Sequence, residues 1–443
     1  MTTRDKLKMG HNKHISLERA LGTLREWRRA RREVRELLDQ WRASIRAASR
    51  GPAHEPVRRA VIVPGDPWTL IGSKGDEAMM IAAAQTLFPA GGGAVGIVTG
   101  TDEADVAAKT LGFEALRVWT HPWQLASVWN VIAAFRADAL LVIGADVMDG
   151  YYNPATSIKL LALADLAACN GLHSVILGFS FNRNPDRRVV GVFDRLNERV
   201  RVNVRDGLSL KRLNSVSSVR AWLVADAAFL LEPDNESLRL AELTDWIHNR
   251  RSAGDRVVGF NLHPMLLKDA TSLDLTRLVG SAATALGRLV ERNGSSVALL
   301  PHDYRERDGD DVCLGPLHSE LIGRFPERIF YPTEHFNARE LKAAAGLMDG
   351  VVTGRMHLAI ASLGMGVPVA ALTYQDKFQG LFDHFGIPHR FLLRPEEARK
   401  ADRLADLVEN FVEEMERLRE LVHARLPEVV CASRGNFLGM IES

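Results

Sequence analysis

Cysteine, long apolar runs and low-complexity segments are rare or absent in this 443-residue sequence. The three cysteines, Cys169, Cys313 and Cys431, are far apart and show no paired spacing. This argues against a disulfide framework or a zinc cluster and is typical of a reducing cytosol. No apolar run reaches the roughly 18 residues that a membrane-spanning helix needs, and the N-terminus is too charged for a secretory signal. We therefore expect a cytoplasmic protein.

Charge is distributed unevenly along the chain. Residues 1–50 carry 14 Lys or Arg against 6 Asp or Glu, a net charge of +8, so the rest of the chain carries −7 within the overall +1. An apolar content of 46% and a charged content of 25% are ordinary for a soluble globular protein. The length predicts two to three domains. The sequence thus indicates a basic N-terminal arm on a mildly acidic body.

The arm, residues 1–55 including a Gly-Pro linker, has the pattern of a long amphipathic helix. Its polar face is rich in arginine. We consider three interpretations: residues 15–46 contact an anionic membrane surface, they pair with a second copy or a partner helix, or their apolar stripe packs on the body. The last is the simplest. Nucleic acid is not expected as a partner, because no aromatic platform accompanies the arginines. The apolar stripe consists of Leu17, Leu21, Leu24, Trp27, Val34, Leu38, Trp41 and Ile45.

Short buried runs alternate with helical patterns after residue 56, as at 60–63, 94–98 and 139–143. This interval predicts strands of a parallel sheet joined by helices. A polar stretch near 232–255 precedes a second series of the same kind. We predict an α/β protein with two doubly wound Rossmann-like domains facing across a cleft, a GT-B-like architecture. The expected ranges are 56–245 for the N-terminal domain, 246–395 for the C-terminal domain and 396–443 for C-terminal helices.

Ligands of open α/β sheets bind at the carboxyl ends of the strands. In the first domain, Gly75 and Asp76 follow the first strand, Asp146 follows the third, and Arg205 begins a helix after another. Gly75 either lets a ligand approach the backbone or only closes a turn. Asp146 is either a catalytic base or the cap of the next helix. In the second domain, Asn261 lies at a strand end.

The segment 349–388 is the most informative of the second domain. Val351 and Val352 predict a buried strand, and a helix is expected to start near Arg355. Arg355 offers a planar fork of donors to a phosphate; as an exposed residue it would contribute little to folding. His357 could transfer a proton near neutral pH. Polar residues also end neighbouring strands, namely His302, Tyr374 and Lys377.

Four motifs in order resemble the polysaccharide pyruvyltransferase family over roughly residues 60–390. They read GSKGDEAMM, IGADVMDG, NVRDGLSLKRL followed by VADAAFLL, and TGRMHLAIASLGMGVPVAALTYQDKFQGLFDHFGIP. The last resembles the Arg-x-His helix, the Gly-Val-Pro strand and the Tyr-x-x-Lys segment of the family. Two motifs depart from the family pattern: SKGDEA lacks an asparagine that many members have before the glycine, and IGAD replaces a run of glycines.

The resemblance implies transfer of a pyruvyl group from phosphoenolpyruvate to two hydroxyls of a sugar, with formation of a cyclic ketal and release of phosphate. It implies no metal and no cofactor besides phosphoenolpyruvate as co-substrate. The acceptor would be a glycan or a lipid-linked sugar, handled at the inner face of the membrane. In this scheme His357 is the acid, Asp146 is the base, and Lys377 neutralises the leaving phosphate. The other expected substrate-binding residues are Arg355, Arg205, Gly75, Asp76, Asn261, His302 and Tyr374.

Two other functions fit the same fold. A sugar-nucleotide-dependent glycosyltransferase would bind a diphosphate at the helix start near Arg355. A non-catalytic polysaccharide-assembly protein would act through its basic arm. Protection by a nucleotide sugar or by phosphoenolpyruvate distinguishes the first alternative from pyruvyl transfer.

Overall fold

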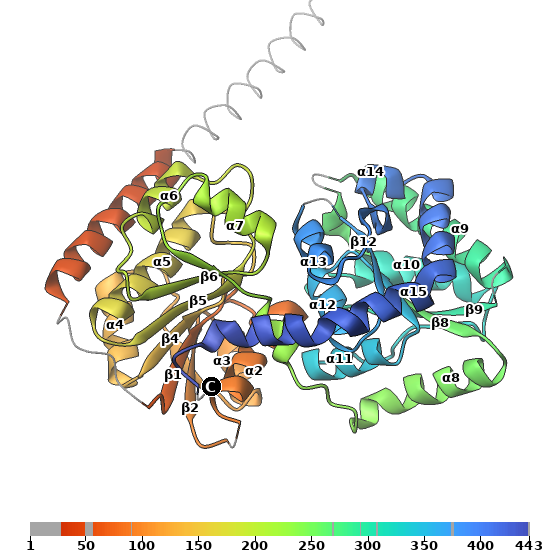
Figure 1. Cartoon of the computed structure of the whole chain (residues 1–443), viewed down its shortest axis with the longest axis horizontal. Coiled ribbons are helices and arrows are strands. Elements are labelled where there is room, and N and C mark those ends of the chain that lie inside the picture. Colours follow the sequence, from red (N-terminus) through yellow and green to blue (C-terminus); the bar gives the residue numbers. More distant parts are fainter. Residues whose placement is uncertain are drawn as a thin grey trace, which may run out of the picture.

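The computed structural model describes residues 28–48, 56–89, 91–267, 270–292, 294–306, 309–373 and 376–441. Two α/β domains lie side by side, and each is built on one sheet of parallel strands (Figure 1). Within the described residues, no helix is both long and apolar enough to cross a membrane.

The first sheet has the strand order β3-β2-β1-β4-β5-β6-β7. Ala60 and Ile62 of β1 belong to one apolar cluster, whereas Val61 and Val63 belong to another. Successive side chains of a strand point to opposite faces, so this central strand is covered on both sides. The elements are β1 (Arg59–Val63), α2 (Lys74–Leu87), β2 (Ala94–Thr99), α3 (Asp102–Thr110), β3 (Glu114–Arg117), α4 (Leu125–Ala134), β4 (Ala139–Val142), α5 (Pro154–Cys169), β5 (His173–Phe179), α6 (Arg187–Phe193), β6 (Val200–Val204), α7 (Gly207–Asn214), β7 (Ala221–Leu223) and the 3₁₀ turns η1 (Ala227–Leu230) and η2 (Leu238–Leu240).

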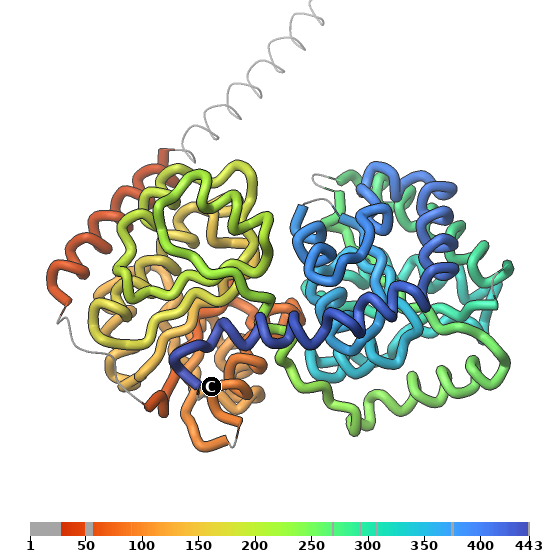
Figure 2. Tube along the Cα trace, in the orientation of Figure 1, coloured from red at the N-terminus to blue at the C-terminus, as the bar shows by residue number. Residues whose placement is uncertain are grey.

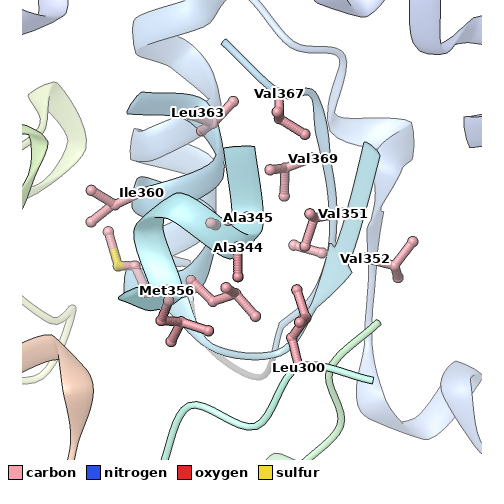
Figure 3. Packing of buried hydrophobic residues seen from close by; sticks show 14 of the residues in the cluster. Leu300, Ala344, Ala345, Val351, Val352, Met356, Ile360, Leu363, Val367 and Val369 are labelled. Carbon is pink, nitrogen blue, oxygen red and sulfur yellow. The ribbon is translucent and has the colours of Figure 1, made fainter. Parts of the chain in front are cut away.

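The second sheet has the order β10-β9-β8-β11-β12-β13, also entirely parallel. Val351 and Val352 of β11 are fully buried and point to opposite faces of the sheet (Figure 3). The elements are α8 (Ala241–Ser252), β8 (Arg256–Phe260), η3 (Pro264–Leu266), α9 (Ser272–Arg292), β9 (Ser295–Leu299), α10 (Asp311–Ile322), β10 (Ile329–Phe330), α11 (Ala338–Gly346), β11 (Gly350–Thr353), α12 (Met356–Gly364), β12 (Val369–Leu372), α13 (Lys377–Phe385), η4 (His389–Phe391), β13 (Leu392–Leu393) and α14 (Pro395–Ala398).

The chain ends in a 34-residue helix, α15 (Ala401–Arg434), which joins the two domains. It packs on α9 of the second domain and then crosses back to the first, as the continuous trace in Figure 2 shows. The turn η5 (Gly435–Phe437) follows it and packs against β5 of the first domain. The C-terminal segment therefore braces the domain pair.

Residues 28–47 of the arm form a helix on the outer side of the first domain (Figure 1). Val34, Leu37 and Trp41 are buried in the cluster that also covers β1 and β4. The indole Nε1 of Trp41 donates a hydrogen bond of 2.7 Å to Asp165. Val34 and Trp41 of the predicted stripe thus pack on the body, as the simplest of the three interpretations expects, together with Leu37, which the predicted stripe did not include. Membrane contact or self-association through residues 15–46 stays a prediction, and residues 1–27 lie outside the described part.

Several predicted boundaries differ from the observed ones. Helix α2 begins at Lys74, so Gly75 and Asp76 lie in its first turn. By contrast, Arg355 is the N-cap of α12, which confirms the helix start that we predicted near this residue. The apolar run 223–231 has the composition of a strand, but it consists of the end of β7 followed by η1. The predicted domain boundary at residue 245 falls inside α8, which packs on β8.

Candidate functional site

Polar side chains from both domains meet where the carboxyl ends of the two sheets face each other. We call this set the interdomain polar cluster. It is positioned by short loops after the strands, because the strands themselves are apolar and buried. The first domain contributes Asp76, Asp146, Arg205 and Asp226, together with the backbone of Gly75, and the second contributes His302, Arg355, His357 and Lys377.

His357, in the first turn of α12, lies at the centre of this cluster. Its Nε2 is 3.6 Å from Oδ2 of Asp226, across the domain boundary. Its ring is stacked nearly parallel to that of His302, with centroids 6.4 Å apart and an interplanar angle of 13°. A Cβ atom added to Gly75 would overlap the His357 ring. The absence of a side chain at Gly75 therefore lets α2 approach the imidazole directly.

Asp226 forms a buried ion pair with Arg205. Nη1 of Arg205 lies 2.7 Å from Oδ2 of Asp226, and each side chain is only 2% exposed. Nε of Arg205 donates to Oγ of Ser180 at 2.8 Å. Burial alone would raise the pKa of Asp226, but His357 and Arg205 together hold it well below its usual range. Asp226 is therefore an anion that faces the imidazole at neutral pH.

Asp76 titrates in a different range. Burial raises its pKa to about 6, and the neighbouring carboxylates of Asp66 and Asp146 act in the same direction, whereas His357 opposes them. The backbone N–H of Asp66 donates to Oδ2 of Asp76 at 3.1 Å. A carboxyl group with this pKa can accept or donate a proton near neutral pH.

Asp146 links the two domains through Lys377, the first residue of α13. Nζ of Lys377 lies 3.1 Å from Oδ2 of Asp146. Burial would raise the pKa of Asp146, but Lys377 and Arg205 lower it below its usual range, so this carboxyl is ionised. Asp146 does not cap the next helix, because Asn153 caps α5.

Arg355 is largely buried, contrary to the exposed position that we expected. Its Nε donates to Oδ1 of Asp310 at 2.8 Å, and its Nη1 lies 3.2 Å from Oδ2 of Asp303. Asn261 donates to the other oxygen of Asp310 at 2.6 Å. The backbone N–H of His302 donates to that same oxygen at 2.8 Å. Arg355, Asn261 and His302 thus share one network around Asp310. This network adjoins His357 through the stacked ring of His302.

Burial strongly affects the pKa values of Asp310 and His302 in this network. Burial raises the pKa of Asp310, although Arg355 opposes the shift. Burial and the positive charge of Arg355 lower the pKa of His302 well below its usual range, so this ring is neutral. No three His, Cys, Asp or Glu side chains in the described part of the chain are grouped to hold a metal ion.

The structure brings nine of the ten predicted site residues into this region, either in the cluster or, for Asn261, in the network behind it. Tyr374 lies outside the described residues. Sequence reasoning missed the roles of Asp226, Asp303 and Asp310. Asp226 follows β7 as Asp146 follows β4, so the rule for strand ends would have found it. We overlooked it because the surrounding apolar run was interpreted as one uninterrupted strand.

Comparison with solved structures identifies the fold. The UDP-GlcNAc 2-epimerase from Neisseria meningitidis, bound to UDP-GlcNAc, has a TM-score of 0.54 and 11% identity over 85% of this chain and 97% of its own. The S. aureus MnaA–UDP co-structure has a TM-score of 0.55 and 12% identity over 87% and 98%. A glycosyltransferase from Rickettsia africae has a TM-score of 0.52 and 11% identity over 87% and 100%. These likenesses confirm the predicted GT-B fold.

Sequence comparison supplies the family. No curated protein matches the chain. A family model described as polysaccharide pyruvyl transferase matches residues 74–376. The match spans more than half of the chain, from the start of α2 to the start of α13, and so includes every described residue of the interdomain polar cluster except Lys377. This chain belongs to the polysaccharide pyruvyl transferase family.

Proposed function

We propose that this protein transfers a pyruvyl group from phosphoenolpyruvate to two hydroxyls of a sugar in a glycan or lipid-linked acceptor, forming a cyclic ketal and releasing phosphate. The observation that carries this proposal is the position of His357. Its Nε2 lies 3.6 Å from an ionised carboxylate, Asp226, and its ring is close enough to act on the pKa of a second carboxyl group, Asp76, which is about 6. This arrangement suits a reaction that needs both an acid and a base at one centre.

Charge favours a doubly anionic donor at this place. Phosphoenolpyruvate carries a phosphate and a carboxylate, and Lys377 stands at the start of α13, where backbone N–H groups and the helix dipole attract anions. Arg205 and Arg355 supply further positive charge, although both are already bonded to carboxylates. Arg205 and Arg355 therefore favour anion binding through the positive electrostatic potential that they create, and not through direct hydrogen bonds from their guanidinium groups.

The proposed reaction has two stages. In the first, His357 protonates the methylene carbon while a sugar hydroxyl attacks carbon 2, and Asp76 accepts the proton of that hydroxyl. In the second, the C–O bond to phosphate breaks, the second hydroxyl attacks carbon 2, and its proton leaves with phosphate. Asp226 stabilises the protonated imidazole before the first transfer. We assign the base to Asp76 rather than Asp146, because Lys377 lowers the pKa of Asp146 and so makes it the weaker proton acceptor.

Substitution of His357 tests this scheme. Turnover is followed as phosphate release from phosphoenolpyruvate with a panel of pyranosides, and ketal formation is followed by NMR. His357→Asn should reduce turnover per folded molecule by about 10²–10⁴, the usual effect of removing one positioned acid. A variant that turns over normally per folded molecule would remove His357 from the chemistry.

Sugar-nucleotide transfer is the second candidate, because two of the similar solved structures hold UDP or UDP-GlcNAc. A thermal-shift panel of phosphoenolpyruvate, UDP and UDP-sugars separates the two functions. A ligand at 100 times its Kd adds about 2.7 kcal/mol to the free energy of unfolding. Stabilisation by UDP compounds but not by phosphoenolpyruvate would favour glycosyl transfer.

A further inference from the structure

Exposed aromatic side chains are concentrated at one edge of the first domain. Among the described residues, the large aromatic side chains that are exposed are Trp68, Tyr151 and Tyr152. All three lie on loops that follow strands of the first sheet, Trp68 after β1 and the tyrosines after β4. Exposed rings add little to folding, so a group of them beside a reaction centre indicates a binding surface.

Tyr151 and Tyr152 form an adjacent pair. Each residue is 47% exposed. Their ring centroids are 5.2 Å apart and the rings are almost perpendicular, at 88°. The pair therefore offers a ring face next to a ring edge, a corner into which a flat, partly apolar molecule can fit.

The loop that carries the pair is tightly held. Asp149 is fully buried, and its carboxylate accepts hydrogen bonds of 2.8 Å from the backbone N–H groups of Tyr151 and Asn182 and from Nδ2 of Asn182. Gly150 has φ of +77°, and a Cβ there would meet Asp186 and Val189. Such a loop presents the two rings without a large entropic cost on binding.

The pair adjoins the interdomain polar cluster. The hydroxyl of Tyr152 lies 3.4 Å from Oδ2 of Asp146, the oxygen that also meets Lys377. Asp146 in turn affects the pKa of Asp76. The rings come from the first domain, whereas His357 and Lys377 come from the second. A molecule on the rings would thus approach the reaction centre from the first domain, beside Asp146 and Lys377.

We infer that Tyr151 and Tyr152 form a platform for one pyranose ring of the acceptor. This inference rests on the proposed function. A pyranose has an apolar C–H face that packs on an aromatic ring, and hydroxyls at its rim that donate to carboxylates such as Asp146. Aromatic rings combined with a few placed polar groups are typical of small-molecule sites.

Binding and turnover are measured on the full chain with methyl glucoside, methyl galactoside and methyl mannoside as probes. Binding is detected by ligand-observed NMR without phosphoenolpyruvate. Tyr151→Ala and Tyr152→Ala should each weaken binding of the preferred pyranoside about tenfold and raise its KM to a similar degree. The KM of phosphoenolpyruvate and the Tm should stay unchanged. Tyr152→Phe keeps the ring and should retain most of the binding.

Leu238→Ala is the matched control, since Leu238 is an exposed apolar side chain away from the site; it should bind as the wild type does. If both alanine variants bind every pyranoside as well as the wild type, the platform is refuted. If the alanine variants lost binding of UDP but kept binding of pyranosides, the platform would also be refuted, and the two rings would be identified as a nucleobase site. Wild type that binds pyranosides through these rings but shows no turnover of phosphoenolpyruvate would refute the proposed function and leave the platform standing.

Discussion

Asp76 and Asp146 are neighbouring carboxylates with opposite behaviour. Burial acts on both and raises the pKa of each. Asp146 has the ammonium of Lys377 at 3.1 Å and the guanidinium of Arg205 nearby, which reverse the effect. For Asp76, the opposing influences of His357 and of the hydrogen bond from the Asp66 backbone N–H are too weak to reverse the effect, and the carboxylates of Asp66 and Asp146 add repulsion. When their environments give two neighbouring acids different pKa values, one can exchange a proton near neutral pH while the other stays ionised.

Asp76→Asn should therefore stabilise the protein while disabling it. The pKa of Asp76 is about 6 in the folded state against an ordinary 3.8. The folded state thus holds this proton more tightly, and the stability that it contributes is complete below pH 4 and lost as pH rises to about 6. Asn removes this dependence, so the variant should gain about 1–3 kcal/mol at pH 7 and nothing at pH 4. Urea unfolding at both pH values measures the difference.

The same group should control the pH dependence of activity. If Asp76 is the base, kcat/KM of the wild type rises with pH through about 6, and Asp76→Asn loses about 10²–10⁴ of the activity. An equally active variant would return the base to Asp146. A variant with no gain in stability at pH 7 would contradict the raised pKa.

Arg355 contributes to the stability of the fold through its buried guanidinium group. Its fork contacts Asp303 and Asp310, so Arg355→Lys should lower the free energy of unfolding by about 1.5–3 kcal/mol, the range for a hydrogen bond to a charged group. Arg394→Lys is the control, because Arg394 is also an N-cap, of α14, but is exposed. Equal stability of the two variants, measured by urea unfolding, would show that the buried fork contributes nothing.

At the scale of elements, the start of α2 and the start of α12 depend on each other. Gly75→Ala would place a methyl group within the space of the His357 ring. The imidazole must then shift from its present position, so turnover should fall at least about 100-fold if His357 is the acid. Gly280→Ala is the control, since a Cβ at this helical glycine of α9 meets nothing within 4 Å. Turnover of both variants is measured as phosphate release at one temperature. Unchanged turnover in Gly75→Ala would show that the position of His357 is not critical for the reaction.

The elements differ in how clearly their sequences predict them. β1 and β4 are continuous apolar runs buried on both faces, and both were predicted. β3 was missed because it is a four-residue edge strand with exposed Glu114 and Arg117, which leaves no apolar run. The break at Asp226 was missed because η1 is a short turn capped by that side chain, and such a turn has no period of its own.

Within the site, the strand-end rule predicted which residues gather, since the carboxyl ends of parallel strands share one edge. It could not predict how they pair. The contacts of His357 with Asp226 and of Lys377 with Asp146 cross the domain boundary, 131 and 231 residues apart in the chain. These contacts depend on how the two domains pack against each other, and no local sequence pattern predicts that packing.

At the scale of the whole molecule, the C-terminal segment holds a loop of the site in the other domain. Oγ of Ser433, at the end of α15, donates to the backbone carbonyl of Asp226 at 2.7 Å. Asn436 donates to the carbonyl of Ala225 and accepts from the N–H of Gly178, both at 2.8 Å. A helix that packs mainly on the second domain thus orders the carboxylate that faces His357.

Asn436→Ala tests whether this brace matters for function as well as for stability. Asn436 is fully buried, and its removal leaves the Gly178 N–H and the Ala225 carbonyl without their partner, so the free energy of unfolding should fall by about 3 kcal/mol. Because the loop at Asp226 loosens, turnover should also fall well below that of the wild type at a temperature where both are folded. Asn410→Ala is the control, since Asn410 lies on α15, is exposed and bonds only within its own helix. Urea unfolding and phosphate release are measured on the same preparations. A less stable Asn436→Ala with unchanged turnover would limit the C-terminal segment to a structural role, because Asp226 would then keep its position without it.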